Sequence, residues 1–238
     1  IQEVIKAAGE IGLEVIYSDT DSIFVKHDAS KTSLLLKRVK DELNMEIRPD
    51  KIYERILFTE AKKRYAGLLP DGTLDIVGME VVRGDWANVA KNVQEKVLEL
   101  VLKDKSPKRA TEFVRRYIRD LREGKFELID FIIWKTLTKP VEEYEVRAPH
   151  VEVAKRLLKE GWELTLGDKV GYVITKGLGK LFEKAKPYSM VSADELDLEY
   201  YLSNQIVPAA LRVLEVLGVP EEELLGKERP GSLADYVR

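Results

Sequence analysis

The chain has 238 residues, 45% of them hydrophobic and 34% charged, which is typical of a globular protein of one or two domains and argues against a disordered one. Lysine and arginine total 39 and aspartate and glutamate 42, so the net charge of −3 disfavours a protein that coats DNA with bulk positive charge but allows a local basic patch. The sequence has no cysteine and two histidines, which excludes disulfides, thiolate zinc sites, a cysteine nucleophile and a histidine-rich metal site.

The first 84 residues contain short apolar segments with the spacing of helices and strands. Apolar residues at helical spacing predict helices over residues 1–12 and 33–43. Five β-rich segments predict strands over residues 13–17, 22–27, 55–59, 64–69 and 73–77. Residues 18–21 form the predicted tight turn between the first two strands, and Pro70-Asp71-Gly72 is a hairpin signal between the last two. This part of the chain is therefore predicted to hold an antiparallel sheet with helices.

From residue 85 onward, apolar residues recur mainly at helical spacing. Asp85 is the predicted N-cap of a long helix, and Trp86 is expected to begin its apolar stripe. The remaining predicted elements are a helix from Ser106 to Gly124 with a buried stripe of Ala110, Phe113, Tyr117 and Leu121, a helix over 149–161, a strand over 169–175, and a helix over 198–217 bent at Pro208. The order predicts an α+β fold in which the sheet precedes a mainly helical part, with the boundary near residues 78–86.

Two aspartates, Asp19 and Asp21, stand at the tip of the first predicted hairpin, in the hexapeptide Tyr-Ser-Asp-Thr-Asp-Ser over residues 17–22. At roughly 5 Å and an effective dielectric constant of about 20, two carboxylates repel each other by about 3 kcal/mol. A cation or hydrogen-bond donors must offset that repulsion, and Mg²⁺ combines few protein carboxylates with water and phosphate oxygens. The pair therefore suits a metal–phosphate site, although aspartates are also ordinary turn residues.

The hexapeptide strongly resembles motif C of the family B DNA polymerases, which usually reads Tyr-Gly-Asp-Thr-Asp-Ser, with Ser18 here in place of Gly. Further segments resemble other motifs of the family in the same order. They are Lys62-Lys63-Arg64-Tyr65 for its Lys-Lys-x-Tyr motif, residues 78–86 for its Gly-Leu-Glu-x-Val-Arg-Arg-Asp-Trp segment, and Pro149-His150-Val151 and residues 197–205 for its thumb. The likeness is greatest to archaeal members.

The resemblance implies a palm-type antiparallel sheet followed by a mainly helical thumb, in a DNA-directed DNA polymerase. The implied division is residues 1–84 for the C-terminal part of the palm, 85–226 for the thumb and 227–238 for a tail. The implied reaction is attack of a primer 3′-OH on the α-phosphate of a dNTP, with two Mg²⁺ ions stabilising the attacking and leaving oxygens. Asp21 is implied as the direct metal ligand, with Asp19 more peripheral.

The basic motif is expected to contact the primer end. On a strand, Lys63 and Tyr65 would share one face and Lys62 and Arg64 the other. Lysine and tyrosine donors can meet the minor-groove acceptors common to all base pairs, which is the role that the resemblance implies for Lys63 and Tyr65. A solvated basic edge strand is the alternative.

Two residues farther along are also expected to contact DNA. The resemblance implies that Arg83 contacts the nucleic-acid backbone. His150, at a predicted helix start, is expected to meet a phosphate or to cap local structure.

Several parts of a family B polymerase have no counterpart in the sequence. A motif A carboxylate, the fingers and an exonuclease domain are absent, and the chain begins with Ile1 rather than Met. We therefore expect a larger partner chain that carries them, and we consider a split polymerase, an expression fragment and a processed chain. The alternative function is a non-catalytic DNA-binding and clamp-tethering subunit derived from a polymerase, which retention of Asp19, Asp21, Lys63 and Tyr65 disfavours.

The remaining expectations concern location and the C-terminus. The longest uncharged run, residues 200–211, is too short to cross a bilayer and no secretory signal is visible, so we expect a cytoplasmic, nucleoid-associated prokaryotic protein without a membrane partner. Residues 230–237 resemble a clamp-binding peptide in degenerate form, with Leu233 and Tyr236 as anchors at i, i+3 spacing. A sliding clamp is thus a further candidate partner, and a frayed terminus is the alternative.

Overall fold

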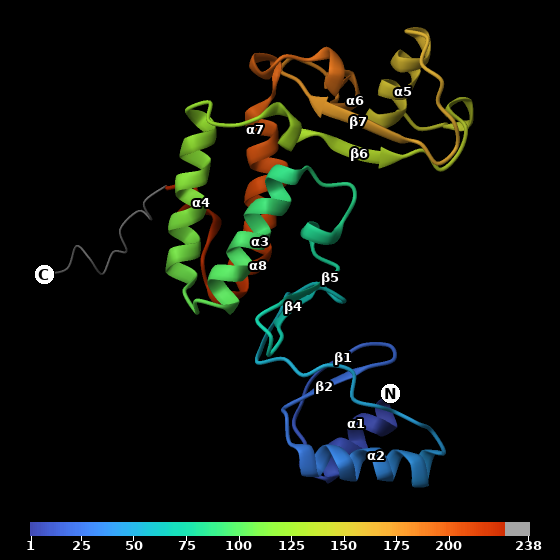
Figure 1. The fold of residues 1–238 in the computed structure, drawn as a ribbon, viewed down its shortest axis with the longest axis vertical. Helices are drawn as coiled ribbons and strands as arrows, with labels where there is room; N and C mark the ends of the chain where they lie inside the picture. Colours follow the sequence, from blue (N-terminus) through green and yellow to red (C-terminus); the bar gives the residue numbers. More distant parts are fainter. Residues whose placement is uncertain (227–238) are drawn as a thin grey trace, which may run out of the picture.

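The computed structural model describes residues 1–226, and its first elements are a hairpin and two neighbouring helices that lie together on one side of it (Figure 1). These elements are α1 (Gln2–Glu10), β1 (Val15–Ser18), β2 (Ile23–Val25) and α2 (Ala29–Leu43). α2 begins at Ala29 rather than at the predicted residue 33, because the Asp28 carboxylate accepts hydrogen bonds from the N–H groups of Ser30 and Lys31, both at 3.1 Å. β1 and β2 pair antiparallel, as the sequence predicted.

These first elements have a small hydrophobic core of their own. Its buried side chains are Val4, Ala7, Ala8, Leu13, Leu35 and Val39. The strand residues Val15, Ile23 and Val25 pack against it. We call residues 1–47 the N-terminal unit, because its buried side chains form a cluster separate from the larger core described below.

A second sheet follows, made of β3 (Arg55–Phe58), β4 (Tyr65–Leu68) and β5 (Leu74–Val77). The strands are antiparallel in the order β3-β4-β5, with Phe58 opposite Tyr65 and Leu68 opposite Leu74. Gly67 lies beneath the ring of Tyr53, where an added Cβ would come within 2.2 Å of the ring. The glycine thus allows the aromatic ring to lie directly on the sheet.

Three helices form a layer beyond this sheet: α3 (Asn88–Leu102), α4 (Pro107–Arg122) and α8 (Val207–Leu214). α3 packs against both α4 and α8, and the three lie side by side in Figure 1. The prediction that Asp85 caps α3 is wrong, because the helix begins after Ala87, whose N–H donates to Gln205 Oε1 at 3.0 Å. Trp86 is therefore half-buried in the segment before the helix rather than in its apolar stripe.

The buried face of α4 also differs in part from the prediction. Ser106 caps the helix and Gly124 follows its last turn with φ of 78°, as expected. The buried side chains are Ala110, Thr111, Val114, Ile118 and Leu121. Phe113 and Tyr117, which were predicted to be buried, are half-buried at the flank and lie against each other with ring centroids 5.8 Å apart.

A third sheet lies at the far end of the helical layer (Figure 1). It contains β6 (Ile133–Thr136), β7 (Lys169–Ile174) and β8 (Ala185–Pro187), all antiparallel, and α5 (Pro149–Lys159) packs against β7 and β8. The sequence predicted β7 and α5 but not the two short outer strands. The α+β class with small antiparallel sheets is confirmed.

The predicted helix over 198–217 is helical throughout but irregular. Its parts are α7 (Leu198–Tyr201), a π-helical segment (Leu202–Ile206), α8 and a 3₁₀ turn (Glu215–Leu217) that ends at Gly218. Pro208 sits in the first turn of α8, so the irregularity falls just before it, because proline has no N–H to continue the preceding hydrogen-bond ladder.

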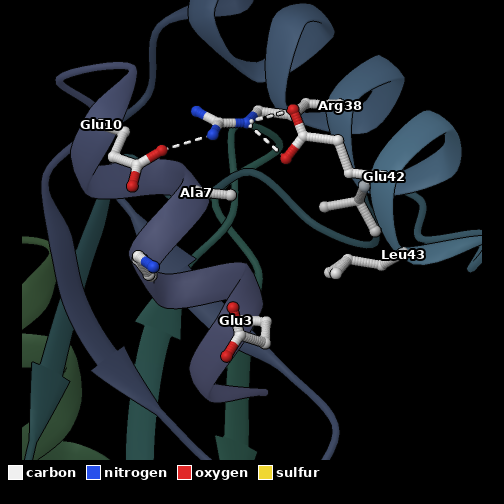
Figure 2. A pocket seen from close by; sticks show the side chains of 8 residues that line it. Glu3, Ala7, Glu10, Arg38, Glu42 and Leu43 are labelled. Atoms are coloured by element: carbon white, nitrogen blue, oxygen red, sulfur yellow. Dashed lines mark hydrogen bonds and ion pairs between the residues drawn. The ribbon is translucent and has the colours of Figure 1, made fainter.

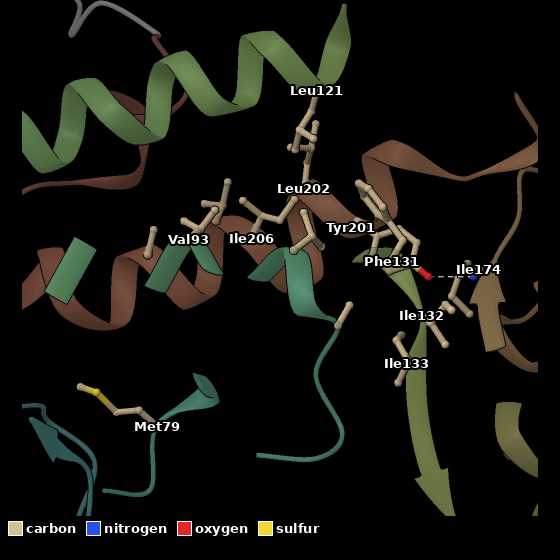
Figure 3. Close-up of a cluster of buried hydrophobic side chains, with 14 of the residues drawn as sticks. Met79, Val93, Leu121, Phe131, Ile132, Ile133, Ile174, Tyr201, Leu202 and Ile206 are labelled. Atoms are coloured by element: carbon tan, nitrogen blue, oxygen red, sulfur yellow. Dashed lines mark hydrogen bonds between the residues drawn. The ribbon is translucent and has the colours of Figure 1, made fainter. Parts of the chain in front are cut away.

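The larger hydrophobic core joins the second sheet, the helical layer and the third sheet. Figure 3 shows its centre, where the rings of Phe131 and Tyr201 meet edge-on and the Tyr201 hydroxyl accepts a hydrogen bond from the Ile174 N–H at 3.0 Å. Leu57, Met79 and Val93 belong to this one cluster, so it includes residues on both sides of residue 84. The division at residue 84 stays a prediction. Within residues 1–226, no helix combines the length and apolar character needed to span a bilayer.

Candidate active site

The two aspartates lie at the tip of the β1–β2 hairpin, which we call the aspartate hairpin (residues 15–25). The turn is tight, because the Asp19 N–H donates to Ser22 O at 2.9 Å and the Thr20 N–H donates to Asp19 Oδ1 at 2.8 Å. Asp19 is half-buried and Asp21 is exposed. The sequence prediction that one turn carries both carboxylates is therefore matched by the backbone.

An aromatic cluster joins this hairpin to the second sheet. Tyr17 stacks on Phe58 with centroids 4.7 Å apart, and Phe24 meets Phe58 and Tyr65 edge-on at 5.2 and 5.1 Å. Such pairs are worth about 0.5–1.5 kcal/mol each beyond their buried area. They hold the aspartate hairpin in place against β3 and β4, although the two belong to different sheets.

The lysine pair of the basic motif lies in the turn between β3 and β4, which we call the Lys63 turn (residues 59–64). The expectation that Lys63 and Tyr65 share one strand face is wrong, because β4 begins only at Tyr65 and Lys63 has a φ of 61°. The Lys63 N–H donates to the Tyr17 hydroxyl at 3.1 Å, and its Nζ lies 3.6 Å from Asp19 Oδ1. The turn therefore brings the basic motif and the aspartate hairpin together.

Gly78 contacts the backbone of the Lys63 turn and restricts its position. Its φ is +67°, and an added Cβ would lie 2.2 Å from the backbone oxygen of Lys63. A glycine is required here both for the left-handed backbone and for the close approach. The motif that begins at Gly78 thus contacts the basic motif directly.

The two aspartates differ in their charge partners. Asp19 is paired with Lys63, whereas none of the ion pairs within residues 1–226 involves Asp21. No group of three acidic or histidine side chains gathers at one point in the described part of the chain. The two aspartates could therefore supply only part of the oxygen ligands that an Mg²⁺ ion takes.

Of the other predicted basic residues, Lys62 is exposed in the Lys63 turn and Arg64 is turned inward. The Nη1 of Arg64 lies 3.3 Å from Oε1 of the buried Glu80. Tyr65 is half-buried, and burial raises the pKa of its hydroxyl, with the Asp75 carboxylate adding to the rise. Tyr65 therefore keeps its proton at neutral pH and can donate a hydrogen bond.

Arg83 lies beyond the buried Glu80 and is held by Asp85. Its Nε and Nη2 donate to the two Asp85 oxygens at 3.1 and 3.0 Å, and Lys135 Nζ lies 3.7 Å from the same carboxylate. The hydrogen bonds from Arg83 are the main cause that lowers the pKa of Asp85. Because both of its oxygens accept hydrogen bonds from Arg83, the Asp85 carboxylate is not free to cap α3.

His150 lies in the first turn of α5 and is half-buried. Its ring meets Tyr144 edge-on with centroids 5.7 Å apart, and burial, aided by the Lys135 charge, lowers its pKa. Arg83 and His150 thus both lie near Lys135. Sequence reasoning missed Lys135, which stands on the unpredicted strand β6.

Two features lie apart from this site. A pocket of about 70 Å³ lies between α1 and α2 and is lined by residues such as Glu10, Arg38 and Glu42, which form ion pairs with one another (Figure 2). Among the described residues, neither Asp19 nor Asp21 lines this pocket. Leu233 and Tyr236, the predicted clamp anchors, lie outside the described residues.

The aspartate hairpin, the basic motif and the segment that begins at Gly78 are in contact although they lie far apart in the sequence. The family model described as DNA polymerase family B matches residues 2–217. The chain belongs to DNA polymerase family B. The resemblance inferred from the hexapeptide and its companion motifs is confirmed.

The proteins that the chain resembles include archaeal DNA polymerases that are much longer. It is 50% identical over its full length to DNA polymerase 2 of Aeropyrum pernix, of which it covers 30%. It is 38% identical to a DNA polymerase of Archaeoglobus fulgidus over 94% of this chain and 31% of that protein. The solved family B DNA polymerase of the hyperthermophilic archaeon Pyrobaculum calidifontis matches 92% of this chain and 29% of that one, with 48% identity and a TM-score of 0.70. The chain thus spans about 30% of the length of these relatives.

Proposed function

We propose that this chain supplies the motif C carboxylates and primer–template contacts of a DNA-directed DNA polymerase, as the C-terminal part of the palm and the thumb. The observation that carries the proposal is the pairing of Lys63 with Asp19 beside an Asp21 that is exposed and outside the ion pairs of residues 1–226. A family B sequence that places its basic motif against one aspartate and leaves the other accessible fits a metal-binding hairpin.

The two aspartates take different roles in this proposal. Asp21 holds a divalent metal, and Asp19 orients Lys63 beside the primer terminus. When bound, two Mg²⁺ ions would supply the charge that stabilises the attacking primer 3′-oxygen and the leaving pyrophosphate. Because the described residues provide only this carboxylate pair at the hairpin, the motif A carboxylate, the fingers and the dNTP contacts come from the rest of the polymerase.

The DNA contacts in this proposal start at the Lys63 turn. Lys63 Nζ and the Tyr65 hydroxyl donate to purine N3 and pyrimidine O2, which every base pair presents in the minor groove. The exposed Lys62 meets the backbone. Arg83 and His150 form a second contact region toward the third sheet, together with Lys135, whose Nζ lies 3.7 Å from the carboxylate that holds Arg83.

The proposal is tested by asking whether primer extension requires both parts of the polymerase. The 238 residues and the remaining polymerase polypeptide are assayed separately and together for Mg²⁺-dependent primer extension. We expect extension only from the mixture, because neither part holds a complete set of metal ligands. Robust extension by the 238 residues alone would refute the proposal, and extension by the remainder alone would assign this chain an accessory role.

A clamp contact through Leu233 and Tyr236 is a separate part of the proposal and rests on the sequence pattern. Deletion of residues 230–238 from the complete polymerase should remove stimulation by a sliding clamp and leave clamp-free extension unchanged. Equal stimulation of the deleted and intact polymerases would show that the tail makes no clamp contact.

A further inference from the structure

Glu80 is a buried carboxylate that the proposed reaction does not use. It lies in a 3₁₀ turn (Glu80–Val82) between β5 and α3, and its side chain is 1% exposed. Three side chains from three different parts of the fold surround it. Arg64 Nη1 lies 3.3 Å and Arg212 Nε 3.4 Å from Oε1, and Gln94 Nε2 donates to Oε2 at 2.6 Å.

A carboxylate in this position is costly unless its partners stay in place. Burial of an ionised carboxylate without compensation is strongly unfavourable, and removal of one partner from a buried pair is strongly destabilising. The partners of Glu80 come from the Lys63 turn, α3 and α8. Their relative positions are therefore coupled through this one side chain.

Gln94 connects the buried carboxylate firmly to the helical layer. Besides its bond to Glu80, its Nε2 donates to the Ala209 carbonyl of α8 at 2.9 Å, and its Oε1 accepts from the Val81 N–H at 2.9 Å. Gln94 itself is fully buried. The 3₁₀ turn, α3 and α8 thus share one hydrogen-bond network.

On its other side the carboxylate connects to the aspartate hairpin. Arg64 directly follows Lys63, whose N–H binds the Tyr17 hydroxyl and whose Nζ lies 3.6 Å from Asp19. Gly78, two residues before Glu80, contacts the Lys63 backbone. A continuous set of contacts therefore runs from α8 through Glu80 and the Lys63 turn to Asp19.

We propose that Glu80, Gln94 and Arg212 are positioning residues that hold the Lys63 turn against the aspartate hairpin, so that the placement of α3 and α8 determines the placement of the primer end. This inference rests on the proposed function. The three side chains act through Lys63 and Tyr65 and do not touch the primer themselves.

Arg212 joins α8 to the buried carboxylate through its charge. Among the described residues, its buried Nε has no hydrogen-bond partner, although it lies within ion-pair distance of Glu80. Arg212 therefore contacts Glu80 as a charge partner, without a hydrogen bond from this N–H.

The test measures single-turnover nucleotide incorporation by the complete polymerase, at saturating duplex and dNTP, in Arg212→Met, Lys63→Ala and the double variant. When two side chains act through the same element, the effects of their substitutions on the rate are not additive in a double-mutant cycle. We therefore expect Arg212→Met alone to slow incorporation about tenfold. In the Lys63→Ala background it should slow incorporation less than about threefold. Arg212→Lys, which keeps the charge, should restore most of the rate. A fluorescent base analogue at the primer terminus reports placement of the primer end independently of turnover.

Arg156→Met is the matched control, because Arg156 is also half-buried and its Nη1 donates to the Ala185 carbonyl at 2.8 Å. This hydrogen bond is not part of the network around Glu80. It should leave the incorporation rate unchanged. If Arg212→Met does not fold, Glu80→Gln, which keeps the shape of the side chain, takes its place in the cycle.

Multiplicative effects of Arg212→Met and Lys63→Ala, or a lowered melting temperature with an unchanged rate, would overturn the inference. The same assay with Asp21→Ala separates this failure from that of the proposed function. Loss of incorporation in Asp21→Ala together with multiplicative effects at Arg212 and Lys63 would refute only the positioning role.

Discussion

At the scale of single residues, neighbours with the same chemistry take different roles because their surroundings differ. Asp19 and Asp21 are two positions apart, yet only Asp19 has Lys63 as an ion-pair partner in residues 1–226. Arg64 is next to Lys63 in sequence but faces the buried Glu80. The sequence motif identifies the residue types, and the local contacts decide which of their side chains remain exposed.

Lys63 and Tyr65 should recognise a primer end without regard to its sequence. We expect Lys63→Ala and Tyr65→Phe in the complete polymerase to weaken binding of a primer–template for all four terminal base pairs alike, because the minor-groove acceptors are shared. Binding titrations with four duplexes that differ only in the terminal pair measure this. A variant that lost affinity for one pair only would contradict the minor-groove role.

The Arg83–Asp85 pair should contribute to stability in a pH-dependent way. The pKa of Asp85 is lowered in the fold, so its contribution is present above the ordinary aspartate pKa and is lost as the pH falls through the lower folded value. Asp85→Asn should therefore reduce the melting temperature of the complete polymerase at pH 7 and have a much smaller effect at pH 3. An equal reduction at both pH values would show that the carboxylate charge is not responsible.

At the scale of elements, the contact between Gly78 and the Lys63 turn predicts a strong effect of a single methyl group. Gly78→Ala should displace the turn and slow incorporation about tenfold, since small misplacements near reacting groups have large effects on rate. Gly72→Ala is the matched control, because Gly72 also has a positive φ but an added Cβ there meets nothing within 4 Å. Rate measurements in which the two variants behave alike would argue against a specific contact.

The sequence predicted most elements of the fold, and its errors have local physical causes. Asp28 was not recognised as a helix cap, so α2 was predicted to start late, whereas Asp85 was predicted as a cap although Arg83 holds its carboxylate. β6 and β8 are only four and three residues long, and β8 ends in proline, so neither has a clear period-2 pattern.

The sequence identified candidate residues for the site but did not predict the contacts between them. The aspartate hairpin and the basic motif are readable from sequence, since each is a short continuous segment. The aromatic cluster of Tyr17, Phe24, Phe58 and Tyr65 and the buried Glu80 depend on contacts between separate segments. Such contacts follow from tertiary packing and leave no periodic signal in one sequence.

At the scale of the whole molecule, the N-terminal unit is the part that is least stabilised by its own contacts. Its sheet has only the strands β1 and β2 within the described residues, and a two-stranded sheet is marginally stable in water. Ile16 and Leu34 are 53% and 56% exposed. These features fit a unit that is completed by the remainder of the polymerase.

Hydrogen exchange should detect that completion. We expect the backbone N–H groups of β1 to exchange markedly more slowly in the complete polymerase than in the separate 238-residue chain, because unpaired edges become paired and apolar side chains become covered. The N–H groups of α3 lie in the larger core and serve as the internal reference. Equal exchange of β1 in both samples would show that the remainder does not cover this unit.

Asp21 is the proposed ligand of the metal that the polymerase needs. The most direct measurement is the rate of Mg²⁺-dependent single-nucleotide incorporation by the complete polymerase carrying Asp21→Ala, Asp19→Ala or Asp71→Ala, alongside primer–template affinity. Asp71 is the control, because it is a turn aspartate of the β4–β5 hairpin that accepts a hydrogen bond from the Thr73 N–H at 2.8 Å. We expect Asp21→Ala to reduce incorporation at least about 1,000-fold with affinity nearly unchanged, since it removes a ligand of the metal that stabilises the transition state. Asp19→Ala should be milder, and Asp71→Ala should be neutral. Wild-type incorporation by Asp21→Ala would contradict the account.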